Sequence, residues 1–517
     1  MRRRRAWKLG SECREPCIGT IEQTGLCLII GQRAVGKDEE GGSMSNPDSP
    51  TRYQAVGLHT VAKLPYWERL DASVREAVDV VGRVLPFRTN QYVVDHLIDW
   101  SRAPEDPIFQ LVFPQRQMLD VAEFNEIRGL LRRTAPTAEE AAVVNRIRRG
   151  LNPHPAGQLT HNVPTLDDRP VQGIQHKYRE TVLFFPAAGQ TCHAYCTYCF
   201  RWAQFVGLED LKFEAQEPDD LVRYLKAHPE VTDVLITGGD PMVMRTRVLR
   251  RYVEPLLSPE LEHVQNIRIG TKAIAYWPQR FVSDDDADDC LRLFEEVVAA
   301  DRHLALMSHY SHPVELEPAI ARTAIQRIRG TGAQIRMQAP LIRHVNDYPD
   351  AWVELWRTGV RLGLIPYYMF VERDTGARDY FEVPLTRCYE IFKKAYSQVS
   401  GLSRSVRGPS MSAFPGKVRI LGIATLRTMM EGTVLAAVKD SLGPELGDPD
   451  TPRLVCDFIQ ARDPEWVKRP FFAEFDEDAA WFDELRPAFG KSRFYFEAEG
   501  DREAPHALPE LTELLLE

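Results

Sequence analysis

Six short apolar or β-branched runs recur through the middle of the chain and limit the folds that it can adopt. Between them lie amphipathic segments such as ADDCLRLFEEVVAA and PAIARTAIQRIR, whose apolar residues repeat at helical spacing. Strands that alternate with helices are typical of a parallel sheet. The six runs begin near residues 181, 233, 266, 303, 333 and 364. We therefore predict an α/β fold built around a partial (β/α)6 barrel.

The remaining chain divides by composition. The segments WERLDASVREAVDVVGRV and AEEAAVVNRIRRGL have helical periodicity and precede the first run. We predict a mostly helical region over 51–170, the barrel over 171–400 and a mixed C-terminal extension over 401–517. Residues 1–50 differ from the rest, with four consecutive arginines and the stretch GGSMSNPDSP. We interpret them as a disordered extension or as sequence upstream of a start at Met44.

Charge and cysteine content exclude several classes of function. A net charge of -10 and a pI near 5.8 argue against nucleic acid or an anionic membrane as the main partner. No apolar run approaches the roughly 20 residues that span a bilayer. Nine cysteines in 517 residues are too few for a disulfide scaffold, and the first residues lack the apolar core of a secretory signal. These features predict a cytoplasmic protein.

Three cysteines follow the first predicted strand. The stretch QTCHAYCTYCF places Cys192, Cys196 and Cys199 in a C-x₃-C-x₂-C spacing after the run TVLFF. Parallel barrels carry their chemistry at this end of the strands. A structural zinc ion needs four ligands, and the nearest candidate, His193, adjoins Cys192 in a poor position for tetrahedral binding. Iron–sulfur clusters prefer thiolates and are therefore favoured, while a zinc-stabilised interaction module is the non-enzymatic alternative.

A second motif follows the second predicted strand. Thr237–Pro241 reads TGGDP, in which Gly238 and Gly239 would let the backbone approach a ligand and Asp240 could pair with an ammonium group. The same residues also suit an ordinary βα turn. Together with the cysteines, this motif resembles the radical S-adenosylmethionine (SAM) enzymes. The resemblance implies a [4Fe-4S] cluster on the three cysteines, with SAM bound at the fourth iron and cleaved to a 5′-deoxyadenosyl radical.

Further stretches resemble one branch of these enzymes, the lysine 2,3-aminomutase family. They occur in order between residues 80 and 425: LPFRTNQYV, DPIFQLVFP, KYRETVLFF, CFRW, GTKAIAYWPQRF, SHYSHPVEL, HVND and IPYYMF. This branch also uses pyridoxal phosphate (PLP). The resemblance implies that Lys417 in SAFPGKVRI forms the Schiff base, that Lys177 binds the phosphate and that Arg201 binds the substrate α-carboxylate.

The resemblance also implies an activity. An α-amino group moves to the β-carbon, after the radical removes hydrogen from that carbon and before the hydrogen returns. It further implies a small amino acid substrate, an electron donor such as flavodoxin or ferredoxin, and association of the chain into dimers or tetramers. A PLP-independent radical SAM enzyme that acts on another small molecule or a peptide is the alternative.

Two positions bear on the substrate. Lysine-specific members hold the side-chain ammonium with two aspartates, which here correspond to Arg373 and Ser410. An arginine suits a carboxylate, and glutamate-specific members are similar in this replacement, so we predict a glutamate-like substrate. A shift of one residue would place Glu372 or Asp374 in the pocket and reverse the argument, which leaves lysine as the alternative.

We expect no structural zinc. Lysine-specific members carry a zinc-ligating cysteine just after VND, where this chain has Tyr348, and no cysteine cluster follows Lys417. The isolated Cys290, Cys388 and Cys456 are interpreted as small apolar residues.

Overall fold

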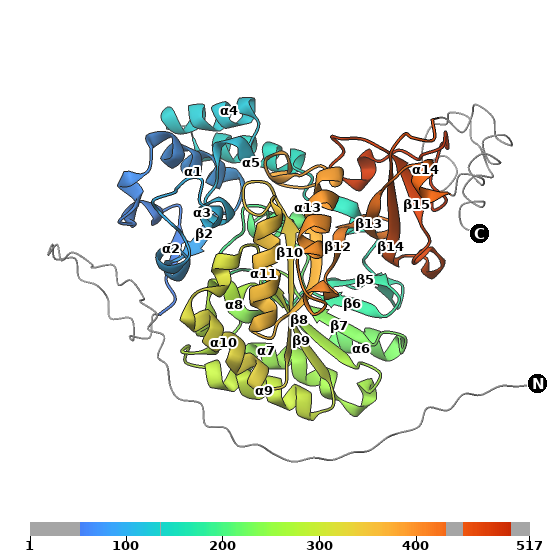
Figure 1. Ribbon diagram of the computed structural model, residues 1–517. Helices are drawn as coiled ribbons and strands as arrows, with labels where there is room; N and C mark the ends of the chain where they lie inside the picture. Colours follow the sequence, from blue (N-terminus) through green and yellow to red (C-terminus); the bar gives the residue numbers. More distant parts are fainter. Residues whose placement is uncertain (1–51, 135, 431–447, 498–517) are drawn as a thin grey trace, which may run out of the picture. The chain divides into compact units, whose positions relative to one another are not determined.

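One sheet of eleven strands runs through the computed structural model, which describes residues 52–134, 136–430 and 448–497 (Figure 1). These residues all belong to one unit, Pro50–Glu517. The expectations for residues 1–50 lie outside the described residues. No helix among the described residues is long and apolar enough to cross a membrane.

Seven neighbouring strands of the sheet are parallel, and they run in chain order. They are β6 (Thr181–Phe184), β7 (Asp233–Ile236), β8 (Asn266–Thr271), β9 (His303–His309), β10 (Gln334–Leu341), β11 (Ile365–Val371) and β12 (Arg407–Ser412). The first six are the predicted runs, so the α/β fold with a parallel sheet is confirmed. The seventh, β12, was not predicted, because its sequence RGPSMS has the glycine, proline and serine of a turn.

Amphipathic helices cover the outside of these strands (Figure 1). In α9, for example, the buried residues Cys290, Leu293, Phe294 and Val297 recur at helical spacing. The helices of this part are α6 (Asp219–Ala227), α7 (Thr246–Val253), α8 (Ala273–Tyr276), α9 (Ala287–Ala299), α10 (Ala319–Gly330), α11 (Pro349–Arg361), α12 (Arg378–Phe381), α13 (Leu385–Ser397) and α14 (Leu426–Met429).

A helical region precedes the sheet and supports the cysteine segment. It contains β1 (Ala55–Gly57), α1 (Ala72–Val84), β2 (Arg88–Asn90), α2 (Gln91–His96), α3 (Pro107–Val112), α4 (Val121–Arg132) and α5 (Thr137–Gly150), followed by a hairpin of β3 (Thr165–Leu166) and β4 (Arg169–Pro170). The Tyr195 N–H donates to the Arg88 carbonyl over 2.8 Å, and the Thr197 N–H donates to the Leu111 carbonyl over 2.9 Å. The helical region therefore holds the backbone between the first two cysteines of the motif and just after the second.

Antiparallel strands extend the sheet at both ends. One is β5 (Ile174–Tyr178), paired with β6; the others are β13 (Gly416–Ala424), β14 (Arg453–Ala461) and β15 (Phe471–Glu474). Lys177 on β5 donates a hydrogen bond to the carbonyl of Ala413, just after β12. The sheet therefore curls until its first strand meets the segment that follows its last parallel strand, which encloses the barrel interior.

Candidate functional site

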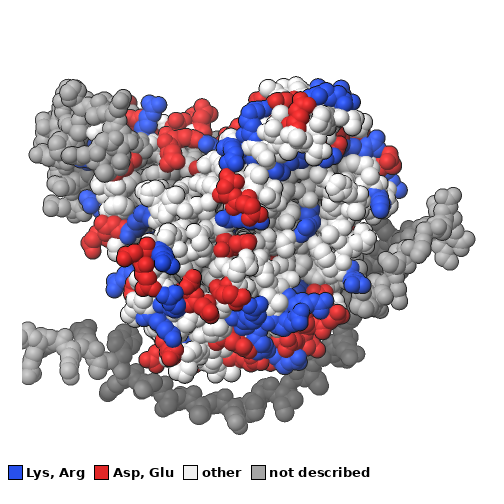
Figure 2. All heavy atoms as spheres, turned by 180° about the vertical axis from the view of Figure 1, so that it is seen from behind, with Lys and Arg blue, Asp and Glu red and all other residues white. Residues whose placement is uncertain are grey.

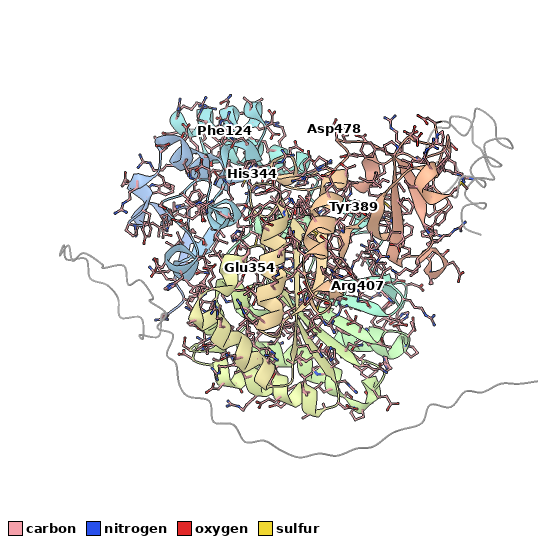
Figure 3. All side chains as sticks on the ribbon, in the orientation of Figure 1. Phe124, His344, Glu354, Tyr389, Arg407 and Asp478 are labelled. Carbon is pink, nitrogen blue, oxygen red and sulfur yellow. The ribbon has the colours of Figure 1, made fainter. Side chains whose placement is uncertain are left out.

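The barrel encloses a cavity of about 400 Å³. Figure 3 shows the side chains of the described residues on the ribbon. Of the residues singled out from the sequence, those that line the cavity are Lys177, Cys192, Cys196, Cys199, Arg201, Gly238, Gly239, Asp240, Arg373 and Lys417. Ser410 does not. Residues that lie up to 240 positions apart in the chain thus meet around one space, as a single catalytic site requires.

The three cysteines of the motif are free thiols on the cavity wall. Burial raises the pKa of all three thiols, that of Cys199 to about 12. They fit an iron–sulfur cluster, because thiolate is the preferred ligand and three thiolates leave one iron open. Among the described residues, no group of three or more His, Cys, Asp or Glu side chains is arranged to hold a single metal ion.

The TGGD segment packs directly on the cysteine segment. The Asp240 N–H donates to the Thr191 carbonyl over 2.7 Å. A Cβ atom on Gly238 would lie 2.1 Å from the amide nitrogen of Gln190, and one on Gly239 would lie 2.4 Å from the Thr191 carbonyl oxygen. Only glycine permits this approach. The two glycines therefore fix the position of the backbone that leads into Cys192.

The carboxylate of Asp240 is already well supplied with donors. It accepts hydrogen bonds from the Thr271 hydroxyl over 2.7 Å, the Lys272 N–H over 2.8 Å and the Met242 N–H over 2.9 Å. Burial nevertheless raises the pKa of Asp240 to about 6. The predicted contact of this residue with a SAM ammonium group stays a prediction.

Lys417 stands in a row of polar residues on three neighbouring strands. Its Cα partners are Ser412 on β12 and Gln460 on β14, and all three residues line the cavity. The ammonium lies 3.4 Å from the Gln460 amide oxygen and 4.3 Å from the ring centroid of Tyr368. Burial lowers the pKa of Lys417 to about 8, so about a tenth of the amine is neutral at pH 7. A neutral, enclosed amine is suited to attack an aldehyde such as that of PLP.

Lys177 lies in a field of positive charge. Burial and, to a smaller extent, the charges of Arg462, Arg373 and Lys417 together lower the pKa of Lys177 to about 6. The Tyr178 ring lies beside both lysines, 5.5 Å from the Lys177 ammonium and 6.0 Å from that of Lys417. Repulsion among these cations would be relieved by an anion, so the region fits the phosphate of PLP.

Two arginines on the cavity wall have nitrogen atoms without partners. Nε and one terminal nitrogen of Arg201 make no hydrogen bond, and the same holds for Arg373. The Arg201 guanidinium lies 4.1 Å from the Phe185 ring centroid. That of Arg373 lies between two rings, 5.6 Å from Phe200 and 5.4 Å from Trp481. Burial lowers the pKa of both arginines, that of Arg201 to about 10.

The residues that flank Arg373 differ in their placement. Glu372 lines the cavity, and burial raises the pKa of its carboxyl well above the usual range. Asp374 does not line it; its carboxylate accepts a hydrogen bond from Asn152 over 3.2 Å.

The structure does not bring Ser410 to the cavity. It lies opposite Phe370 on β11, and the Phe370 side chain reaches the wall instead. Ser412, two residues further along β12, does line the cavity. Ser410, seven residues before Lys417, is therefore buried but does not line the cavity, and its hydroxyl makes no hydrogen bond.

Two cavity residues that the sequence did not indicate are Gln460 from the C-terminal region and Ser412 from β12. Trp481, also from the C-terminal region, does not line the cavity but packs against Arg373. No motif marks them, because their positions depend on cross-strand register and on how the C-terminal segment folds back. Cys290, Cys388 and Cys456 are buried and free in α9, α13 and β14, as expected of small apolar residues.

Comparison with known proteins decides the family. No family model matches the chain. A putative L-lysine 2,3-aminomutase of Aquifex aeolicus is 30% identical over 366 residues, which are 71% of this chain and 85% of that protein. The chain belongs to the lysine 2,3-aminomutase family of radical SAM enzymes. The L-lysine 2,3-aminomutase of Clostridium subterminale is 28% identical over 234 residues, 45% of this chain and 53% of that enzyme.

Membership in this family establishes the general chemistry. The chain is an isomerase of the aminomutase type, and the family uses a [4Fe-4S] cluster, SAM and PLP. A radical SAM methyltransferase structure from Sphaerobacter thermophilus matches 60% of this chain and 89% of its own, at 15% identity. Its TM-score is 0.32, too low to support any argument.

Proposed function

We propose that this protein is a PLP-dependent radical 2,3-aminomutase for an amino acid that bears a carboxylate on its side chain, such as glutamate. The observation that supports this substrate class is the pair Arg201 and Arg373. Both line the cavity that also holds the cysteines and Lys417, and each has two guanidinium nitrogens that make no hydrogen bond, although Asp374 lies 3.6 Å from Arg373 Nε. A dicarboxylate would supply one anion to each arginine.

The two arginines serve different ends of the substrate. Arg201 lies two residues after Cys199 in the chain and lines the same cavity, so it would bind the α-carboxylate at the cysteine end. Burial and then nearby charges, that of Arg373 among them, lower the pKa of Lys177. Arg373 would therefore bind the side-chain carboxylate at the Lys177 end.

The other residues bind or orient the cofactors in this proposal. Cys192, Cys196 and Cys199 hold the cluster, Lys417 forms the Schiff base and Lys177 binds the phosphate. When bound, the cluster and SAM supply a hydrogen-abstracting radical, and PLP supplies an unsaturated centre over which the radical spreads. The enclosed wall excludes water from the reacting carbon.

Lysine is the second candidate substrate, and Glu372 is the observation that favours it. This carboxyl lines the cavity beside Arg373 and could accept a hydrogen bond from an ammonium group. Burial raises the pKa of Glu372 well above its ordinary value, however, which disfavours the charged carboxylate that would bind an ammonium group. We therefore rank Arg373 above Glu372 as the determinant of the substrate.

Partners and location remain proposals. One-electron chemistry at the cluster needs a donor such as flavodoxin or ferredoxin, and we expect self-association and a cytoplasmic location. On the face seen in Figure 2, acidic and basic side chains are interspersed, which suits a small-molecule enzyme better than a nucleic-acid-binding surface.

An anaerobic turnover assay tests the proposed substrate. Cluster-reconstituted protein receives SAM, reductant, PLP and either L-glutamate or L-lysine, and chromatography detects the β-amino isomers. We expect β-glutamate as the main product. β-Lysine alone would retain the aminomutase chemistry and refute the assignment of Arg373. Formation of 5′-deoxyadenosine without either isomer would favour the PLP-independent alternative.

A further inference from the structure

The antiparallel pairing of β13 with β14 brings a polar side chain from the C-terminal region to Lys417. Lys417 and Gln460 are Cα partners across the two strands, with a register shift directly after Lys417. The strands approach closely here: a Cβ atom on Gly416 would lie 2.5 Å from the Gln460 carbonyl oxygen. A register shift of this kind changes the direction of nearby side chains. The local backbone therefore determines the directions of the Lys417 and Gln460 side chains.

Few groups hold the Lys417 ammonium in place. The Gln460 amide oxygen, 3.4 Å away, is the one side-chain oxygen within the described residues recorded as accepting a hydrogen bond from it. The Tyr368 ring centroid lies at 4.3 Å and the Phe370 ring centroid at 5.8 Å. A flexible lysine would otherwise sample many rotamers. The hydrogen bond to Gln460 and the contact with the Tyr368 ring together limit the rotamers that Lys417 can adopt.

We propose that Gln460 is a positioning residue for Lys417: its amide oxygen holds the amine against Tyr368, both before the amine reacts with PLP and after the substrate amine replaces it. This inference rests on the proposed role of Lys417 as the Schiff-base lysine. It assigns β14 a part in the active site, although this strand lies beyond residues 80–425, the part of the chain that resembles the family.

Other charged or titratable groups also act on the Lys417 amine, and they come from several strands. The charges of Tyr367 on β11 and Asp233 on β7 favour the protonated amine, whereas those of Arg268 on β8 and Arg407 on β12 disfavour it. On β5, the Tyr178 ring centroid lies 6.0 Å from the Lys417 ammonium, and the charge of Lys417 is among the causes that lower the pKa of Lys177. Figure 3 labels Arg407. None of these groups changes in variants of Gln460, so a shift in such variants reports Gln460 itself.

The test measures the rate of Schiff-base formation against pH. Only the neutral amine attacks the aldehyde, so the midpoint of the pH–rate profile reports the pKa of Lys417. Holoprotein with the cluster in place is stripped of PLP and mixed with it anaerobically. Difference spectra against the protein at zero time remove the cluster absorbance. Reduction with borohydride and peptide mass analysis confirm that Lys417 carries the adduct.

Two variants should move the midpoint in opposite directions. Gln460→Leu removes the acceptor, so we expect a midpoint about one pH unit lower. Gln460→Glu places an anion beside the ammonium, so we expect a midpoint about one to three units higher. Gln334→Leu, on β10 and outside the cavity wall, is the matched control and should leave the midpoint unchanged. A general folding defect would not shift the two Gln460 variants in opposite directions.

The outcomes separate this inference from the proposed function. An adduct on Lys417 with the same midpoint in both Gln460 variants would overturn the role of Gln460 and leave the proposed function intact. Absence of an adduct on Lys417 in the unmodified protein would overturn both.

Discussion

Replacing Arg373 should separate activity from stability. Its guanidinium is largely enclosed, with a side-chain exposure of 16%, and its Nε lies 3.6 Å from the Asp374 carboxylate. Two of its nitrogens make no hydrogen bond. Burial of a charged group without full compensation costs free energy. Arg373→Met removes this cost and keeps the apolar contacts with Phe200 and Trp481, but it also leaves Asp374, with a side-chain exposure of 11%, without its ion-pair partner. The two effects oppose each other, so the thermal midpoint should change little.

The same substitution should strongly weaken the reaction with glutamate. Loss of one partner from a desolvated, hydrogen-bonded charge pair costs about 2–5 kcal/mol. At about 1.4 kcal/mol per tenfold, kcat/KM for glutamate should fall by roughly 30- to 4000-fold. Because the side-chain carboxylate does not react, the loss should appear mainly in KM. Arg387→Met, which removes an exposed arginine paired with Glu390, is the control.

The assay measures initial rates of β-glutamate formation over a range of glutamate concentrations, together with thermal unfolding of each variant. The reasoning about Arg373 would be refuted by an unchanged KM. A large fall in the thermal midpoint would also refute it, because it would mean that Arg373 supports the fold.

Three further predictions concern the surroundings of the cofactors. Gly239→Ala places a Cβ atom against the backbone of the cysteine segment, so it should lower the free energy of unfolding by about 1–3 kcal/mol and reduce the iron bound per chain. The control, Gly129→Ala in α4, has no atom within 4 Å of the added Cβ and should do neither. Iron analysis and thermal unfolding compare the two variants. Lys272→Met leaves Glu315, whose side chain is 0% exposed, without its partner at 2.7 Å. That should cost about 3–5 kcal/mol, most of it recovered in the Lys272→Met, Glu315→Gln double variant, as thermal unfolding would show. Lys177, with a pKa near 6, should take up a proton when the PLP phosphate binds. A bound anion raises that pKa, so the phosphate should contribute more to the affinity for PLP as pH falls from 8 toward 6. Calorimetry in buffers of different ionisation enthalpy should detect the proton uptake, and the Lys177→Met variant should show no such uptake.

The parallel strands and the cysteine site could be predicted because their signals are local. Each apolar run is short, is bounded by turn residues and is followed by an amphipathic helix, so chain order alone sets the parallel sheet. The cysteines and the TGGD segment follow the first two strands, and strand ends in such a sheet lie side by side. The local sequence pattern did not predict β12, because its glycine and proline are typical of a turn. This segment is a strand because it pairs with β11.

The substrate end of the cavity could be predicted only in part, because it depends on register. Counting residues from Tyr368 reached Arg373, which lines the cavity, whereas counting back from Lys417 reached Ser410, which does not. The positions of Gln460 and Trp481 depend on how β14 pairs with β13 and on how the segment after β15 packs against Arg373. No local sequence signal encodes such long-range contacts.

Isotope transfer from the substrate tests the central claim most directly. The claim is that one cavity joins the radical-generating cysteines, Lys417 and two carboxylate-binding arginines around a dicarboxylic amino acid. Glutamate deuterated at the β-carbon would be incubated anaerobically with the loaded enzyme, and mass spectrometry would follow the label. The account predicts deuterium in 5′-deoxyadenosine and in β-glutamate. Transfer from β-deuterated lysine, with none from glutamate, would contradict it.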